Sequence, residues 1–129
     1  MSLPVVFHPD YVAPLRQGHR FPMSKYGYLR EHLIARGVIE QGGYLSPSAA
    51  GPGLLTLAHD PSYVDQVLGK TLNEAAIRTI GLPLTDRLVR RVRLSSAGTL
   101  LAARLALEHG AACNGAGGSH HAAREAGAG

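Results

Sequence analysis

Residues 95–122 read SSAGTLLAARLALEHGAACNGAGGSHHA, and this stretch decides the fold that the sequence predicts. Its first part predicts a helix from Ser95 or Ser96 to Glu108. That helix is apolar around most of its circumference, which is typical of a helix buried against a sheet. His109 and Gly110 end the helix, and residues 111–114 are predicted to form a strand. Because residues 5–7 (Val-Val-Phe) also predict a strand, the order of elements favours parallel strands joined through helices, an α/β fold.

The predicted strand leads into a glycine-rich bend, 115–118, that presents two adjacent histidines, His120 and His121. Neighbouring side chains on an extended backbone point in different directions. The pair is therefore better suited to two tasks in one pocket than to binding one metal ion together. One interpretation is a polar loop or a helix cap, and the other is a catalytic or ligand-binding role, which would need carboxylates to set the histidine tautomers.

Known metal and nucleotide motifs do not account for the two histidines. The sequence has no Asp-x-His, Cys-x-x-Cys or His-Glu-x-x-His motif. A zinc site needs three or four protein ligands, so zinc held by the pair is the weaker interpretation. Gly115 and Gly117 match the start of the dinucleotide-binding fingerprint, but His120 stands at its third glycine position.

The rest of the chain predicts shorter elements and loops. Residues 11–22 and 41–53 are predicted to be irregular because of their prolines and glycines. The predicted elements are a helix that Ser24 caps and Gly37 ends, a short strand or single turn at 54–58, a helix from the Asp60-Pro61 cap to about Leu68, a helix at 72–80, and a further helix capped by Thr85. The last eight residues, 122–129, predict neither a helix nor a strand.

Composition bounds the class of protein. A chain of 129 residues, 45% hydrophobic and 17% charged, is expected to form one soluble globular domain. The net charge of +4 comes largely from the arginines of the run RLVRRVR at 87–93, which predicts a solvated or loop-facing basic face. A nucleic-acid partner is not favoured, because no aromatic residues interleave that run. The single cysteine, Cys113, rules out an internal disulfide and predicts a buried, unreactive thiol.

Targeting segments are not evident in the sequence. No stretch has the roughly 20 apolar residues that a membrane span needs, and the N-terminus lacks the regions of a secretory signal. A cytoplasmic location with no membrane partner is the default expectation.

A second candidate site lies at 19–26, HRFPMSKY. Arg20 precedes a predicted helix, where an arginine is commonly a surface residue. In the functional interpretation, Arg20 turns inward to bind a carboxylate or a row of carbonyl groups. His59 and Asp60, just before Pro61, indicate a turn and a helix cap rather than a site.

Four segments together resemble the N-terminal part of the zinc-dependent histone deacetylase superfamily. The resemblance is to bacterial members and the class IV type, which are related to acetoin-utilisation proteins and acetylpolyamine amidohydrolases. It implies that the predicted parallel sheet, flanked by helices, is the incomplete N-terminal part of an arginase/deacetylase-type fold. The segments are FHPDYVAPLRQGHRFPMSKYGYLREHLIARG, LLTLAHDPSYVDQVL, IGLPLTDRLVRRVRLSSAGTLLAARLALEHG, and NGAGGSHHA followed by GAG.

The resemblance implies roles for four residues. His121 would be the general base that deprotonates a zinc-bound water and later donates the proton to the leaving amine. His120 would help to hold the neighbouring charge and hydrogen-bond network. Gly118 matches a glycine that lines the acyl channel, and Arg20 matches the arginine of an internal channel for the acetate product. The implied substrates of full-length members are acetylated lysine peptides, polyamines or small acyl amides.

The chain departs from the family pattern in its metal ligands. In the family, the Asp-x-His pair and the later Asp that hold zinc, and the Tyr that polarises the oxyanion, lie beyond the position of Gly129. Residues 1–129 are thus expected to be a partial deacetylase domain, truncated before the metal ligands. We expect that it holds no zinc, is inactive as given and self-associates through an exposed sheet edge. The alternative is a non-catalytic remnant that acts as a binding or interaction module.

Overall fold

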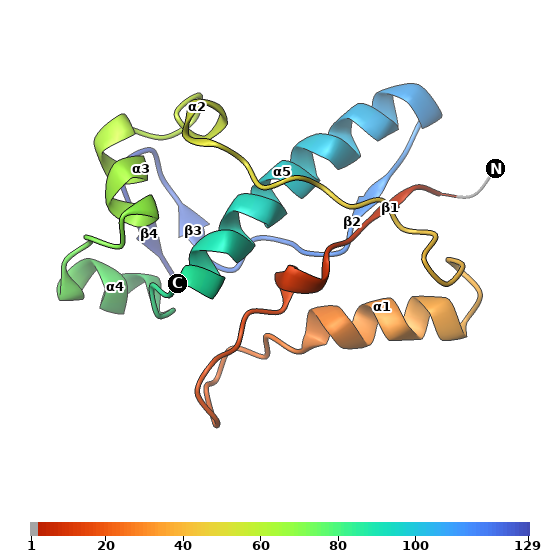
Figure 1. The fold of residues 1–129 in the computed structure, drawn as a ribbon, viewed down its shortest axis with the longest axis horizontal. Helices are drawn as coiled ribbons and strands as arrows, with labels where there is room; N and C mark the ends of the chain where they lie inside the picture. Colours follow the sequence, from red (N-terminus) through yellow and green to blue (C-terminus); the bar gives the residue numbers. More distant parts are fainter. Residues whose placement is uncertain (1–2) are drawn as a thin grey trace.

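One long helix, α5 (Asp86–His109), crosses the computed structural model, which describes residues 3–129 (Figure 1). Its start is capped by Thr85, whose Oγ1 accepts a hydrogen bond from the Leu88 N–H at 3.1 Å. The helix predicted to begin at Ser95 or Ser96 is therefore the second half of this longer one. Ser95 does not cap a helix, because its hydroxyl donates back to the Val92 carbonyl within the same helix.

The other elements surround α5. The predicted caps are confirmed at Asp60, which accepts from the N–H groups of Ser62 and Tyr63. The segment at 54–58 is helical at its start rather than a strand, and the predicted helices near 24–37, 61–68 and 72–80 are present. The elements are β1 (Val5–Val6), the 3₁₀ helix η1 (Pro9–Tyr11), α1 (Lys25–Ala35), α2 (Pro52–Leu55), α3 (Pro61–Leu68), α4 (Glu74–Ile80), β2 (Cys113–Asn114), β3 (His121–Ala122) and β4 (Gly127–Ala128).

Strands β1 and β2 pair in parallel, in a register that places Val5 opposite Cys113. Leu45 forms a single parallel bridge with Val6, so β1 has neighbours on both sides. The parallel pairing predicted for these two strands is confirmed, and the chain has a mixed α/β structure. Within residues 3–129 the parallel sheet has two strands, and the larger arginase/deacetylase-type sheet stays a prediction.

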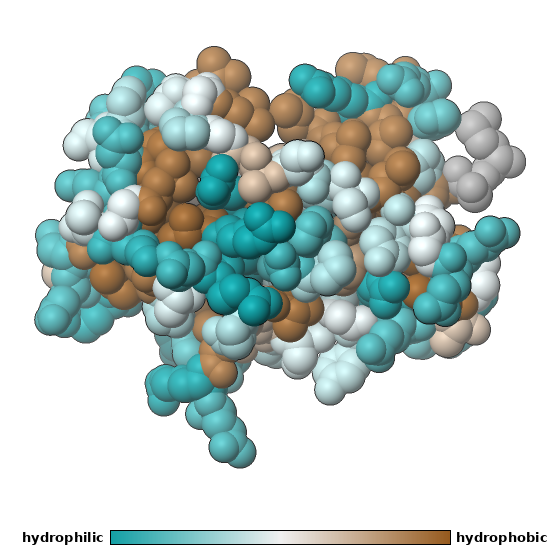
Figure 2. All heavy atoms as spheres, in the orientation of Figure 1, coloured by the Kyte–Doolittle hydropathy of each residue, from teal (hydrophilic) through white to brown (hydrophobic). Residues whose placement is uncertain are grey.

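Helix α5 buries one face rather than its whole circumference. Its buried residues recur every three or four positions, and they are Leu88, Val89, Arg91, Leu94, Gly98 and Ala102. Leu107, near its end, is 89% exposed. Figure 2 shows apolar surface over α2 and over the C-terminal half of α5. The sequence predicted a helix buried against a sheet. Helix α5 does contact β1 and β2, but its second half also exposes apolar residues such as Leu107.

The C-terminal residues form a hairpin, where the sequence predicted no element. Strands β3 and β4 are antiparallel, with His121 opposite Ala128. The Gly129 N–H donates to the Thr79 carbonyl at 3.0 Å, which ties the end of the hairpin to α4. These contacts join residues far apart in the sequence, so the small residues at 122–129 gave no local sign of them.

Cys113 is exposed, so the prediction of a buried thiol was also wrong. Strand β2 pairs with β1 along one edge only among residues 3–129, and the Cys113 side chain is left in contact with solvent.

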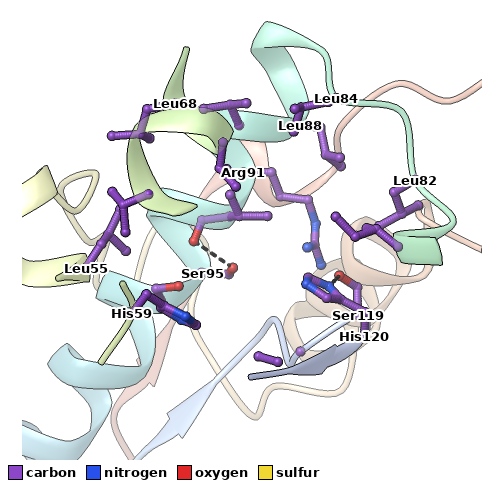
Figure 3. Close-up of a pocket in the computed structure, with 18 of the residues that line it drawn as sticks. Leu55, His59, Leu68, Leu82, Leu84, Leu88, Arg91, Ser95, Ser119 and His120 are labelled. Carbon is purple, nitrogen blue, oxygen red and sulfur yellow. Dashed lines mark hydrogen bonds between the residues drawn. The ribbon is translucent and has the colours of Figure 1, made fainter. Parts of the chain in front are cut away.

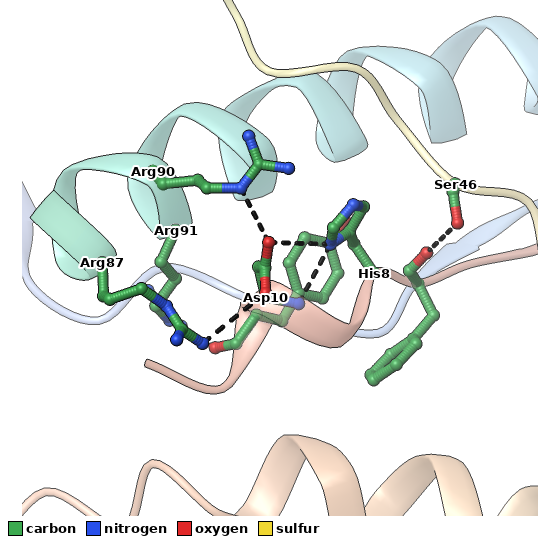
Figure 4. A network of polar contacts seen from close by, with 8 residues as sticks. His8, Asp10, Ser46, Arg87, Arg90 and Arg91 are labelled. Atoms are coloured by element: carbon green, nitrogen blue, oxygen red, sulfur yellow. Dashed lines mark hydrogen bonds and ion pairs between the residues drawn. The ribbon is translucent and has the colours of Figure 1, made fainter. Parts of the chain in front are cut away.

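The basic run at the start of α5 is partly solvated and partly faces the loops that pack on the helix, since Arg93 Nε donates to the Ala50 carbonyl at 2.7 Å. Arg87 and Arg90 are exposed and form ion pairs with Asp10 at 3.6 and 2.7 Å (Figure 4). The hydrogen bond and charge of Arg90 lower the pKa of Asp10. Arg91, the next residue after Arg90, is 1% exposed and is therefore not part of the solvated face. A helix turns about 100° per residue, so adjacent arginines of one run face opposite environments.

Tyr11 joins η1, α5 and β2. Its side chain is fully buried, and its hydroxyl donates to Asn114 Oδ1 at 2.8 Å. Burial raises the pKa of Tyr11 to about 12, so the hydroxyl keeps its proton at neutral pH. Arg91 Nε donates to the Tyr11 carbonyl at 2.8 Å. Asn114 in turn donates to the Ser95 carbonyl and to Thr99 on α5.

None of the helices in residues 3–129 combines the length with the apolar composition that crossing a bilayer requires.

Gly98 lets α5 approach this junction closely, and its replacement by alanine tests the packing. A Cβ on Gly98 would overlap the Tyr11 hydroxyl and lie 3.0 Å from the Asn114 amide atoms. We predict that Gly98→Ala lowers the free energy of unfolding by about 1–3 kcal/mol, the usual cost of overpacking, measured by urea denaturation. The matched control is Gly27→Ala in α1, where the new Cβ would meet only Val12 at 3.6 Å. That change should stabilise the chain by about 0.5–1 kcal/mol. Equal effects of the two substitutions would contradict the packing described here.

Candidate functional site

A cavity of about 220 Å³ lies between α3, α5, the turn that joins α4 to α5, and the Gly118–His120 segment (Figure 3). Its walls are mostly aliphatic. The aliphatic side chains that line it are Leu55, Val64, Val67, Leu68, Ile80, Leu82, Leu84, Leu88, Val89 and Val92. A largely apolar pocket with a few convergent polar groups is the usual form of a small-molecule site.

The polar side of the cavity is formed by His59, Arg91 and the Ser119-His120 pair (Figure 3). The Ser119 hydroxyl lies 3.2 Å from His120 Nδ1. His59 Nδ1 donates to the Ala123 carbonyl at 2.9 Å. That bond leaves Nε2 of a neutral His59 as a hydrogen-bond acceptor.

The C-terminal hairpin holds His120 in place. Its loop is tied to the 59–60 turn, since the Asp60 N–H donates to the Arg124 carbonyl at 2.9 Å, and its C-terminal end is tied to α4 through Gly129. A Cβ on Gly127 would lie 2.8 Å from His120 Cδ2 and 3.0 Å from Nε2. Glycine at 127 is thus needed for the imidazole to occupy this position, which gives the Gly-Ala-Gly sequence at 127–129 a structural role.

The environment of His120 favours its neutral form. Burial is the largest cause that lowers the pKa of His120, and the nearby charges of Arg91, His121 and His59 lower it further. A neutral imidazole with a free ring nitrogen accepts a proton at neutral pH, as a general base must.

The side chains of the two adjacent histidines point in different directions, as neighbouring side chains on an extended backbone do. His120 is half-buried and lines the cavity, whereas His121 is exposed on β3 and lies outside the cavity lining. The structure therefore brings His120, and not His121, together with His59 and Arg91.

The other two predicted site residues lie close to the same segment. Gly118 is exposed and lines the cavity beside Ser119. Arg20 is also exposed, and it lines a second hollow that shares Leu82 and Ser119 with the first.

The described residues do not by themselves fit a zinc centre. Between residues 3 and 129, no three His, Cys, Asp or Glu side chains are grouped closely enough to hold a metal ion. Zinc sites use at least three protein ligands, and the cavity brings together two histidines and an arginine. The two histidines and the arginine that line the cavity can transfer protons and form hydrogen bonds.

Two residues of the cavity were missed by sequence reasoning. His59 was interpreted as part of a turn, and its position in the site depends on the hairpin 64 residues later. Arg91 was interpreted as solvated. A single helix from Thr85 would have placed Arg91 on the apolar stripe with Leu88 and Leu94, so helical periodicity carried a usable signal.

Comparison with known proteins assigns the chain to a family. The histone deacetylase domain matches residues 19–129. The chain belongs to the histone deacetylase family. The match includes Arg20, Gly118, His120 and His121, while β1 and η1 precede it.

Two relatives show how much of a longer protein this chain matches. An uncharacterised protein of Picosynechococcus is 47% identical over 122 residues, which are 95% of this chain and 41% of that protein. Histone deacetylase 2 of Arabidopsis thaliana is 30% identical over 118 residues, which are 86% of this chain and 30% of that protein. The chain therefore spans about two-fifths or less of the length of these curated relatives.

The lowered pKa of His120 predicts how stability depends on pH. Below the ordinary value of 6.5, the unfolded chain binds a proton that folded His120 does not bind until the pH falls further. The free energy of unfolding should therefore fall as the pH drops through 6.5 towards the folded pKa. Urea denaturation at about pH 7.5 and about pH 5.5 measures this loss, and NMR titration of the ring gives the pKa itself. His120→Gln should show a smaller loss. A ring that titrates at or above the ordinary value would contradict the site's electrostatics.

Proposed function

We propose that this chain is part of a zinc-dependent deacetylase that hydrolyses acetyl-lysine-type or related acyl amides, and that His120 and His121 perform its proton transfers. The observation that carries the proposal is His120: a half-buried imidazole with a lowered pKa, at the polar side of an apolar cavity, in a chain of the histone deacetylase family. Deacetylation needs this combination of an apolar acyl site and a base.

The chemistry of amide hydrolysis assigns the tasks. A neutral imidazole takes a proton from the attacking water and returns it to the amine as the carbon–nitrogen bond breaks. His121 is proposed as that base on the family resemblance alone, since it is exposed on β3 and lies outside the cavity lining that includes His120. His120, held by Ser119 and by its place against Gly127, is proposed to orient the neighbouring hydrogen-bond network. Gly118, without a side chain, leaves room beside them for an acyl group, and Arg20 is proposed to bind the carboxylate product.

Zinc dependence is proposed for the full-length protein, with ligands that the described residues do not bring together. The proposal assigns proton transfer to this chain and metal binding to residues outside it. The 129-residue chain alone should then be inactive.

The experiment compares the product of the native gene with the 129-residue chain. Each is incubated with zinc and either an acetyl-lysine peptide or an acetylated polyamine, and release of the acyl group is measured. We predict turnover by the native product and a loss of about 100-fold or more in kcat/KM for His121→Ala, because general-base catalysis contributes that much. His32→Ala, which removes an exposed histidine of α1, is the matched control and should leave turnover unchanged.

Two results would contradict the proposal. One is turnover by the 129-residue chain above that of its own His121→Ala variant. The other is a native product whose kcat/KM is unaffected by both His120→Ala and His121→Ala.

One observation favours the alternative, a non-catalytic interaction module. Leu57 and Leu107 are 79% and 89% exposed, and apolar surface of this kind is typical of a contact with another protein or another copy. If the native gene product is inactive, and the chain dimerises in gel filtration, the interaction module becomes the better account.

A further inference from the structure

Arg91 is a buried cation with an unused hydrogen-bond donor. Its side chain is 1% exposed, its Nε donates to the Tyr11 carbonyl, and its guanidinium stacks 4.8 Å from the centre of the Tyr26 ring. Nη2 is buried and has no hydrogen-bond partner within residues 3–129. Arg87 and Arg90 pair with Asp10, but Arg91 forms no ion pair in the described part of the chain. A buried charge without a counter-ion is costly, and burial lowers the pKa of Arg91.

The unused donor adjoins the cavity described above. Figure 3 shows the Arg91 side chain extending from α5 towards Ser119 and His120 at the polar side of the cavity. No aspartate or glutamate is among the described residues that line it. The cavity therefore offers positive charge and hydrogen-bond donors on one side and leucine, isoleucine and valine side chains on the others.

We propose that this cavity binds a small aliphatic carboxylate. One carboxylate oxygen accepts a hydrogen bond from the guanidinium of Arg91, which lines the cavity, and the hydrocarbon tail packs against the apolar side chains of α3 and α5. A single planar anionic group suits a guanidinium, and a monocarboxylate brings only that one charged group into an otherwise apolar space. A phosphate would leave further charged oxygens desolvated against leucine and valine.

The inference concerns binding and is independent of hydrolysis. Acetate, the product of the proposed reaction, has one methyl group and would leave most of the cavity unfilled. Affinity should therefore depend on tail length, which separates this site from one that handles acetate alone.

The test is calorimetric titration of the 129-residue chain with acetate, butyrate and hexanoate, and with hexanol as the uncharged analogue. Each buried methylene group should tighten binding about fourfold, from about 0.8 kcal/mol of transfer free energy. Hexanol should bind at least about tenfold more weakly than hexanoate, because it lacks the charged hydrogen bond. Arg91→Met should weaken hexanoate binding by a similar factor, and Arg90→Met, which removes the neighbouring exposed charge, should not change it.

A second variant keeps the test decisive if Arg91→Met does not fold. Val67→Trp on α3 fills the cavity without touching Arg91 and should abolish hexanoate binding. In the unaltered chain, bound hexanoate should raise the pKa of His120 in an NMR titration, since the carboxylate offsets the Arg91 charge that lowers it.

Equal affinity for hexanol and hexanoate, or binding that survives Val67→Trp, would overturn the proposal. The proposal would also be overturned if the 129-residue chain bound hexanoate and the native gene product did not. In that case a carboxylate side chain of the native product would occupy the site.

Discussion

Hydrogen bonds from the buried Tyr11 hold the long helix α5 and the short parallel sheet in one relative position. Through its hydroxyl Tyr11 binds Asn114 of β2, and through its carbonyl it binds Arg91 of α5. Asn114 also bonds to α5, so the short parallel sheet and the long helix are fixed to each other by a polar network rather than by apolar contact alone. Buried polar groups of this kind favour one arrangement because any other leaves them unpaired.

The same network positions the candidate site. Arg91 is oriented by its bond to the Tyr11 carbonyl, and this bond leaves the rest of the guanidinium beside the cavity. Asn114 ends β2 just before the glycine bend that leads to Ser119 and His120, and its bonds to Ser95 and Thr99 fix the start of that bend against α5. The charge of Arg91 and the burial of His120 then keep the imidazole neutral. The chemistry proposed for His120 therefore depends on contacts made by residues that precede the family match.

Local signals predicted much of the fold, and long-range contacts account for what they missed. The Asp60-Pro61 and Thr85 caps act within a few residues, so the helices that they begin were predictable, as was the parallel pairing of β1 with β2. The C-terminal hairpin, the exposure of Cys113 and the burial of Arg91 each depend on partners distant in sequence. In the site, the separation of His120 from His121 followed from strand geometry, whereas the approach of His59 required the hairpin.

If Tyr11 and Asn114 stabilise the fold as a coupled pair, a double-mutant cycle will measure their coupling energy. The free energy of unfolding is measured for Tyr11→Phe, Asn114→Ala, the double variant and the unaltered chain. We expect a coupling energy of about 1 kcal/mol or more, because either single change leaves a buried polar group without its partner. Strictly additive effects would contradict it.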